Sequence, residues 1–139
     1  LQGKDITIYG NGLQSRSFCY VKDLIEGLIR LMNCENISGP INLGNSAEYS
    51  MLELAEKVIK LTGSNSKLRF YPLPENDPKQ RCPDIRLAVE KLSWIPNFDL
   101  EEGLEKTIKH FEKLIVDIND FSFDRRASMA KMAYLKKLA

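Results

Sequence analysis

Two arginines in polar, turn-rich settings are the residues of this sequence best suited to bind an anion. Arg16 follows a Gly-Asn-Gly turn in the stretch ITIYGNGLQSRSFCYVKD, residues 6–23. Arg81 lies in a proline-rich loop, PLPENDPKQRCP, residues 72–83. A guanidinium presents a planar fork of donors that matches phosphate oxygens, so two converging arginines suit a pyrophosphate. Taken singly, each arginine is more simply a solvated side chain or half of a surface salt bridge.

The glycine turn beside Arg16 does not match the known phosphate loops. A dinucleotide fingerprint needs a third glycine, but the sequence has Ser15 at that position, and no GK[ST] of a P-loop occurs. The turn is therefore interpreted as structural. Tyr9 before it could stack on a base or hydrogen-bond a ribose, or be a half-buried aromatic. Gln14 could hydrogen-bond a ligand, or be a solvated turn residue.

Other catalytic chemistries lack a matching pattern. The single histidine, His110, lies within a helical stretch and has no partner motif. Cys19, Cys34 and Cys82 are far apart and form no CxxC pair, which argues against a zinc site or a disulfide framework and favours a reduced intracellular chain. The sequence shows no HExxH or GxSxG motif. We therefore predict no catalytic residue and no metal ligand from these motifs.

The composition argues against nucleic-acid-binding and membrane-spanning proteins. The 139 residues include 20 basic and 19 acidic side chains, for a net charge of +1. This balance argues against a general nucleic-acid binder, which needs a dense cationic surface. No apolar run approaches the ~18 residues of a membrane span, and no signal peptide is visible. We expect a soluble cytoplasmic domain with neither nucleic acid nor membrane as a partner.

The pattern of the first half predicts an α/β fold. Alternating β-formers at 5–9 and 16–21, joined by Asn11-Gly12, predict a hairpin with a type I′ turn. Asp23 is positioned to cap a helix over 23–33. A βαβ unit is predicted next. It consists of a strand over 41–43, a helix that starts with a capping box and ends at a glycine, and a strand over 67–71. The capping box pairs Ser50 with Glu53, and Gly63 is the predicted stop.

The second half predicts helices around an aromatic anchor. Residues 72–83 read as a loop because of their four prolines, and Asp84 is positioned to cap a helix over 85–92. Trp94 is predicted to anchor the core. A long helix is expected over 100–116, and the segment 117–139 predicts a basic amphipathic helix.

Several of these stretches resemble one enzyme family. YGNGLQSRSFCYVKD (9–23) resembles the YGxGxQxRxFxYVxD signature of sugar-nucleotide enzymes of the extended short-chain dehydrogenase/reductase (SDR) superfamily. INLGN (41–45) resembles their late strand. NDPKQRCPDI (76–85) resembles their late loop, and LSWIPNFDLEEGLEKTI (92–108) resembles the segment that leads into their final helix. Ser93 stands where that last pattern has a glycine. The similarity runs from about residue 3 to 116. The motifs are more similar to those of UDP-glucuronate decarboxylases than to those of dTDP-glucose dehydratases or UDP-galactose epimerases.

The resemblance implies a role for individual residues. It implies that Arg16 and Arg81 contact a UDP pyrophosphate, and that Tyr9 and Gln14 line the nucleotide pocket with the backbone near Thr7. The matching arginine of the family also makes Arg81 a candidate contributor near the reacting sugar. Asp23 is expected to hold the junction of hairpin and helix and to take no part in the chemistry.

The resemblance also implies parts that this chain does not contain. The family binds NAD through an N-terminal GxxGxxG and uses a Tyr-x-x-x-Lys pair, and neither occurs here. We therefore expect the substrate-binding, C-terminal part of an extended SDR (NAD-dependent epimerase/dehydratase) fold, inactive alone and without its own cofactor. Its expected partners are a UDP-sugar, the N-terminal Rossmann domain of the parent enzyme and a second copy in a homodimer.

Two hypotheses remain open from the sequence. The first is the UDP-sugar-binding part of an NAD-dependent UDP-glucuronate decarboxylase, or of another nucleotide-sugar epimerase or dehydratase, with a substrate-binding domain over 1–116 and a variable tail over 117–139. The second is a non-catalytic interaction or oligomerisation module in which the basic tail binds a partner.

Overall fold

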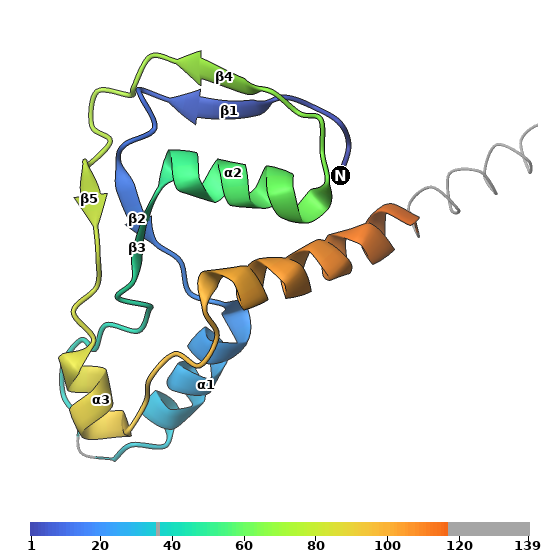
Figure 1. Ribbon diagram of the computed structural model, residues 1–139. Helices are drawn as coiled ribbons and strands as arrows, with labels where there is room; N and C mark the ends of the chain where they lie inside the picture. The colour runs from blue at the N-terminus through green and yellow to red at the C-terminus, as the bar shows by residue number, and fades with distance from the viewer. Residues whose placement is uncertain (36, 117–139) are drawn as a thin grey trace, which may run out of the picture. The chain divides into compact units, whose positions relative to one another are not determined.

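The computed structural model describes residues 1–35 and 37–116, and the chain divides into two compact units, Leu1–Glu105 and Lys106–Ala139. Both units are drawn in Figure 1. In chain order the first unit contains β1 (Ile6–Tyr9), β2 (Ser15–Ser17), α1 (Val21–Met32), β3 (Glu48–Ser50), α2 (Met51–Thr62), β4 (Leu68–Tyr71), β5 (Gln80–Arg81) and α3 (Arg86–Leu92). The predicted helix over 100–116 begins in this unit and continues into the second, where His110 is exposed. The α/β class is confirmed, and the segment 117–139 lies outside the described residues.

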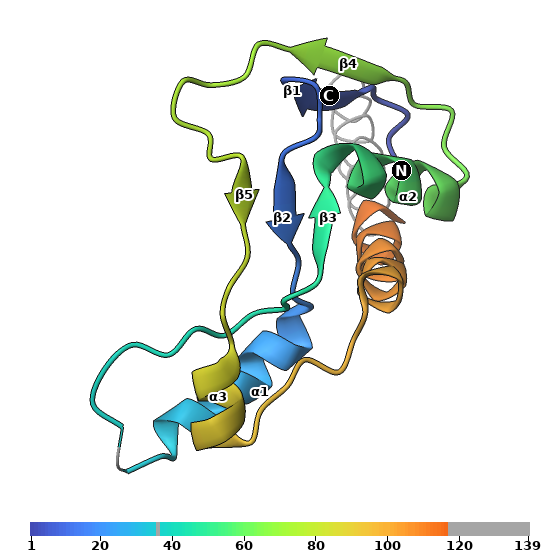
Figure 2. The ribbon, with the colours of Figure 1, turned by 60° about the vertical axis from the view of Figure 1, so that its left-hand side comes forward.

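The strands form two small sheets instead of the predicted hairpin. β1 pairs in parallel with β4, from Ile6 opposite Leu68 to Tyr9 opposite Tyr71. β2 lies between β3, its antiparallel neighbour, and β5, its parallel neighbour, as Figure 2 shows. The predicted hairpin of β1 with β2 is therefore wrong, because the two strands belong to different sheets.

The turn between β1 and β2 explains this difference. Gly10 and Gly12 have positive φ angles of 64° and 75°, but Asn11 between them does not, so the turn is not type I′. A hairpin turn would return the chain beside β1. Here the backbone carbonyl of Gly12 accepts a hydrogen bond of 3.0 Å from the amide of Leu52, which ties the turn to α2.

The predicted βαβ unit is also wrong, although its helix is confirmed. Residues 41–43 form no strand, and β3 and β4 lie in different sheets. The capping box is present: the Ser50 hydroxyl accepts from the Glu53 amide at 3.1 Å, and the Glu53 carboxylate accepts from the Ser50 amide at 2.7 Å. Gly63 ends α2 in the left-handed conformation that glycine adopts without strain.

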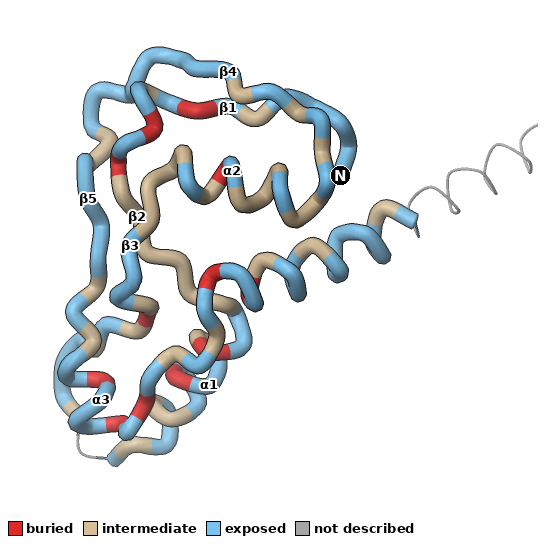
Figure 3. Tube along the Cα trace, viewed as in Figure 1, coloured by how far each residue is buried: buried red, intermediate tan, exposed pale blue. Residues whose placement is uncertain are grey.

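The core of the first unit surrounds Trp94, as predicted. Its buried members are Ala88, Leu92 and Trp94, and Leu31 and Leu43 are among the half-buried apolar residues packed against them. Figure 3 shows buried segments on α1 and α3, whereas β5 is exposed. The core therefore joins α1, α3 and the segment around Leu43.

Asp23 and Asp84 act differently from the predicted caps. α1 begins at Val21 with Tyr20 as its N-cap, so Asp23 lies inside the first turn. Its carboxylate instead accepts hydrogen bonds from the amides of Asn97 and Phe98, at 3.0 and 2.9 Å. The N-cap of α3 is Ile85, although the Asp84 carboxylate still accepts from the amide of Arg86.

α1 turns its apolar stripe away from the first unit. A helix of a globular protein usually buries its apolar stripe. The residues of α1 that are buried here are Asp23 and Gly27, and a Cβ on Gly27 would lie only 3.0 Å from side-chain atoms of Leu43 and Trp94. The exposed stripe of α1 consists of Val21, Ile25, Leu28, Ile29 and Met32. Within the described residues, no helix has the length and apolar character needed to cross a membrane.

Candidate functional site

A cavity of about 300 Å³ lies between β1, β2, the start of α2 and the loop after β4. Four of the five predicted site residues line it, and the fifth, Arg81, does not. The lining residues are Thr7, Ile8, Tyr9, Gln14, Arg16, Met51, Pro74 and Asp77. The chain crosses between the two sheets at this point. This crossing brings residues that are well separated in the sequence to one pocket.

Gln14 is a buried part of the pocket wall rather than a solvated turn residue. It is only 9% exposed, and its side-chain amide donates a hydrogen bond of 2.8 Å to the backbone carbonyl of Tyr9. This bond spans the turn and holds the end of β1 against the start of β2. Tyr9 itself is half exposed, so its ring remains accessible to a ligand.

Arg16 is partly buried and paired. Its side chain is 18% exposed, and its Nη2 lies 2.5 Å from Oδ1 of Asp77, which is 29% exposed. Its Nη1 donates to the backbone carbonyl of Ser15 at 2.7 Å. Of the two simple interpretations of Arg16, the solvated side chain is wrong, whereas the salt bridge is present and partly buried. The sequence reading did not single out Asp77, although it lies in the same NDPKQR stretch as Arg81.

Arg81 lies beside Arg16 in the three-stranded sheet. β2 and β5 are parallel, and Arg16 and Arg81 are register partners. Paired residues of neighbouring strands point to the same face of a sheet, and the strands lie about 4.8 Å apart. The register therefore brings the two predicted anion-binding arginines to adjacent positions from segments 65 residues apart (81 − 16).

Glu48 holds the short strands of this sheet together. Its carboxylate accepts hydrogen bonds from the Ser15 hydroxyl at 2.6 Å and from the Gln80 side-chain amide at 2.7 Å. These bonds, the Ser15 bond foremost, lower the pKa of Glu48. Glu48 of β3 thus bridges β2 to β5, which has only two residues, and helps to fix Arg81 beside Arg16.

Comparisons with known proteins show which enzymes this chain resembles. The model of the NAD dependent epimerase/dehydratase family matches residues 1–44. UDP-glucuronic acid decarboxylase 1 of Danio rerio is 50% identical over 113 residues, which are 81% of this chain and 27% of that protein. UDP-glucuronic acid decarboxylase 4 of Arabidopsis thaliana is 46% identical over 115 residues, 83% of this chain and 26% of that protein. This chain is thus similar to members of the NAD-dependent epimerase/dehydratase family.

Solved structures of UDP-sugar epimerases agree with this similarity. UDP-glucuronic acid 4-epimerase of Bacillus cereus, in complex with UDP-glucuronic acid and NAD, matches with a TM-score of 0.76 and 31% identity over 81% of this chain and 37% of that chain. UDP-glucose 4-epimerase of Thermotoga maritima, with UDP-glucose, matches with a TM-score of 0.78 and 27% identity over 82% and 37%. The chain spans about a quarter of the length of the curated relatives it matches.

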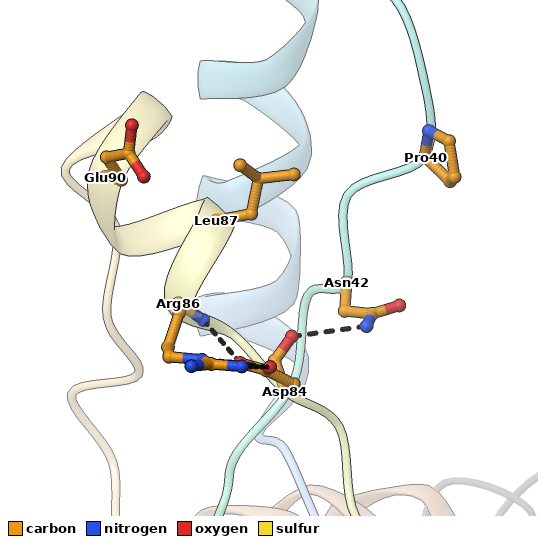
Figure 4. A pocket seen from close by; sticks show the side chains of 6 residues that line it. All are labelled: Pro40, Asn42, Asp84, Arg86, Leu87 and Glu90. Atoms are coloured by element: carbon orange, nitrogen blue, oxygen red, sulfur yellow. Dashed lines mark hydrogen bonds and ion pairs between the residues drawn. The ribbon is translucent and has the colours of Figure 1, made fainter.

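A second hollow, of about 430 Å³, contains none of the predicted site residues. Figure 4 shows it between α3 and the segment before β3. The Arg86 guanidinium donates to both carboxylate oxygens of Asp84, and this contact lowers the pKa of Asp84 to about 2. The residues that line this second hollow are Pro40, Asn42, Asp84, Arg86, Leu87 and Glu90. The pocket around Arg16 is the better candidate site, because four of the predicted site residues line it and none lines this hollow.

The part of the chain that the structure describes offers no cluster of three or more metal-ligating side chains. The Gly10–Gly12 turn also differs from a dinucleotide site. It leads into β2 rather than into a helix N-terminus, where a pyrophosphate would meet free amides.

Proposed function

We propose that this chain is the UDP-sugar-binding portion of an NAD-dependent UDP-glucuronate decarboxylase, an enzyme that converts UDP-glucuronate to UDP-xylose and CO2. The observation that carries the proposal is the pocket in which Thr7, Tyr9, Gln14 and Arg16 meet beside Arg81. The identity of about half to the named decarboxylases supports this reaction over that of another nucleotide-sugar epimerase or dehydratase.

Each predicted site residue has a role in this proposal. Arg16 and Arg81 bind the pyrophosphate, because guanidinium groups pair with phosphate oxygens through charge-assisted hydrogen bonds. The exposed ring of Tyr9 stacks on the uracil or bonds the ribose, and Gln14 and the backbone at Thr7 shape the pocket. Arg81, which is exposed at the end of β5, also extends toward the sugar. We assign no catalytic base to this chain, and we place NAD on a part of the parent enzyme outside it.

Titration of UDP, monitored by NMR or calorimetry, tests the pyrophosphate assignment. Arg16→Ala and Arg81→Ala are each expected to weaken UDP binding about 10- to 100-fold, since a hydrogen bond to a charged group contributes about 1.5–3 kcal/mol. Uridine, which lacks the phosphates, should bind equally to all variants. Arg86→Ala is the matched control, because Arg86 pairs with Asp84 outside the pocket. Unchanged UDP binding in both Arg16→Ala and Arg81→Ala would show the assignment to be wrong.

The exposed stripe of α1 supports a protein partner as well. An apolar helix face of this kind marks an interaction surface. We propose that it contacts the N-terminal Rossmann domain of the parent enzyme, within a homodimeric, cytoplasmic protein. The free thiols of Cys19, Cys34 and Cys82 suit a reducing compartment. The same face also favours the second candidate, a non-catalytic oligomerisation module.

Light scattering tests whether the stripe of α1 or the tail makes a contact between copies of the chain. The isolated chain is expected to self-associate through the stripe, and Ile29→Lys should shift it toward monomer because a charge is costly in an apolar contact. Leu13→Lys is the control, since Leu13 is equally apolar and more exposed but lies off the stripe. Truncation after residue 116 tests the tail: dimers that persist without it assign the contact to α1, and dimers that are lost assign it to 117–139. A monomer at every concentration would contradict an interaction surface on either segment.

A further inference from the structure

Arg16 already binds a carboxylate inside the pocket that is proposed to bind phosphate. Asp77 lies 2.5 Å from Nη2 of Arg16, and both side chains line the cavity. A carboxylate offers the same planar pair of acceptor oxygens to a guanidinium as a phosphate does. A phosphate that reaches Nη2 of Arg16 therefore meets a group of like charge already bound there.

The two ends of this ion pair are held differently. Arg16 belongs to a paired strand, and its Nη1 is fixed by the carbonyl of Ser15 at 2.7 Å. Asp77 belongs to the loop between β4 and β5, where its amide donates to the carbonyl of Pro74 at 3.2 Å. The arginine is thus anchored to the sheet, whereas the carboxylate is carried by a loop outside it.

We propose that Asp77 is an internal counter-ion of Arg16 that a ligand phosphate must displace, so that ligand binding moves the loop 72–79. This inference rests on the proposed function and names how that site is regulated. Without a ligand, Asp77 compensates the partly buried charge of Arg16, which would otherwise be costly to bury. With a ligand, a phosphate oxygen takes over Nη2 and repulsion drives the carboxylate away. The ion pair therefore lowers the affinity for anions that the arginines would otherwise have.

The variant Asp77→Asn tests this exchange because it removes the charge and keeps the shape of the side chain. Inorganic pyrophosphate, UDP and uridine are titrated separately into the complete 139-residue chain. Pyrophosphate and UDP are expected to bind the variant about two- to fivefold more tightly than the wild type, the size of effect of a partly exposed ion pair. Uridine should bind both equally. Asp84→Asn is the charge-matched control, since it removes a carboxylate outside the pocket.

Each outcome of the titration supports or overturns the counter-ion proposal. Weaker pyrophosphate binding by Asp77→Asn would overturn the proposal and make Asp77 a positioning residue for Arg16. An equal gain in Asp84→Asn would assign the effect to net charge and overturn it too, as would no pyrophosphate binding by either form. If pyrophosphate shows the expected gain but neither UDP nor uridine binds, the counter-ion stands and the proposed function fails. Amide NMR shifts over 72–79 on addition of pyrophosphate to the wild type report the loop movement independently of affinity, and their absence would refute it.

Discussion

Replacing Trp94 with alanine is expected to lower the free energy of unfolding by about 3–5 kcal/mol, the usual cost of removing a large aromatic side chain from a core. Trp94 is 1% exposed and is the largest fully buried side chain among the described residues. Its indole N–H also donates to the backbone carbonyl of Asp23 at 3.0 Å, so it joins the segment after α3 to α1. Its loss would leave both a cavity and an unpaired carbonyl.

Urea unfolding followed by circular dichroism is the appropriate measurement. Trp94 is the only tryptophan in the chain, so its fluorescence disappears with the substitution. Ile95→Ala is the matched control: Ile95 is the next residue and is 56% exposed, so its loss should change stability by only about 0.5 kcal/mol. A change below about 1 kcal/mol in Trp94→Ala would contradict the core assigned here.

Asp23→Ala is expected to cost about 2–4 kcal/mol, because hydrogen bonds to a charged group are worth about 1.5–3 kcal/mol each and do not add fully. Asp23 is 2% exposed, and one of its oxygens accepts from the amides of both Asn97 and Phe98. Removing the carboxylate leaves two backbone donors without their partner. The same urea experiment measures the loss.

Two comparison variants sharpen this prediction. Asp23→Asn keeps one acceptor oxygen and should lose less than Asp23→Ala. Asp99→Ala removes an exposed acceptor that binds the amide of Glu102, and an exposed helix cap is worth about 1 kcal/mol. Equal losses for Asp23→Ala and Asp99→Ala would show that burial adds nothing to the Asp23 contact.

Features of the fold that depend on neighbouring residues were predictable from the sequence. The capping box of Ser50 and Glu53 and the stop at Gly63 are confirmed because each involves contacts within one turn of a helix. The prediction of Trp94 as the core anchor is confirmed, because a large apolar side chain between two helices is most stable when buried between them. Four of the predicted site residues also share one pocket, since β1 and β2 are separated by only five residues.

Strand pairing was not predictable, because it depends on distant segments. The partner of Ile6 is Leu68, and the partner of Arg16 on β5 is Arg81. Strands of two to four residues have too little alternation to specify a partner, so a nearby hairpin was the natural but wrong prediction. Asp77 was overlooked for the same reason, since only the folded chain brings its loop to Arg16.

The crossing of the chain between two sheets also determines when the pocket can form during folding. α1 and α2 depend on local contacts, but β1 must wait for β4, which follows 62 residues later (68 − 6). Closing so long a loop has an entropic cost before any contact compensates it. The pocket needs both sheets, so we expect it to form late in folding. Contacts that are absent from the transition state slow unfolding without speeding folding, so a ligand in this pocket prolongs the lifetime of the folded chain rather than hastening its formation.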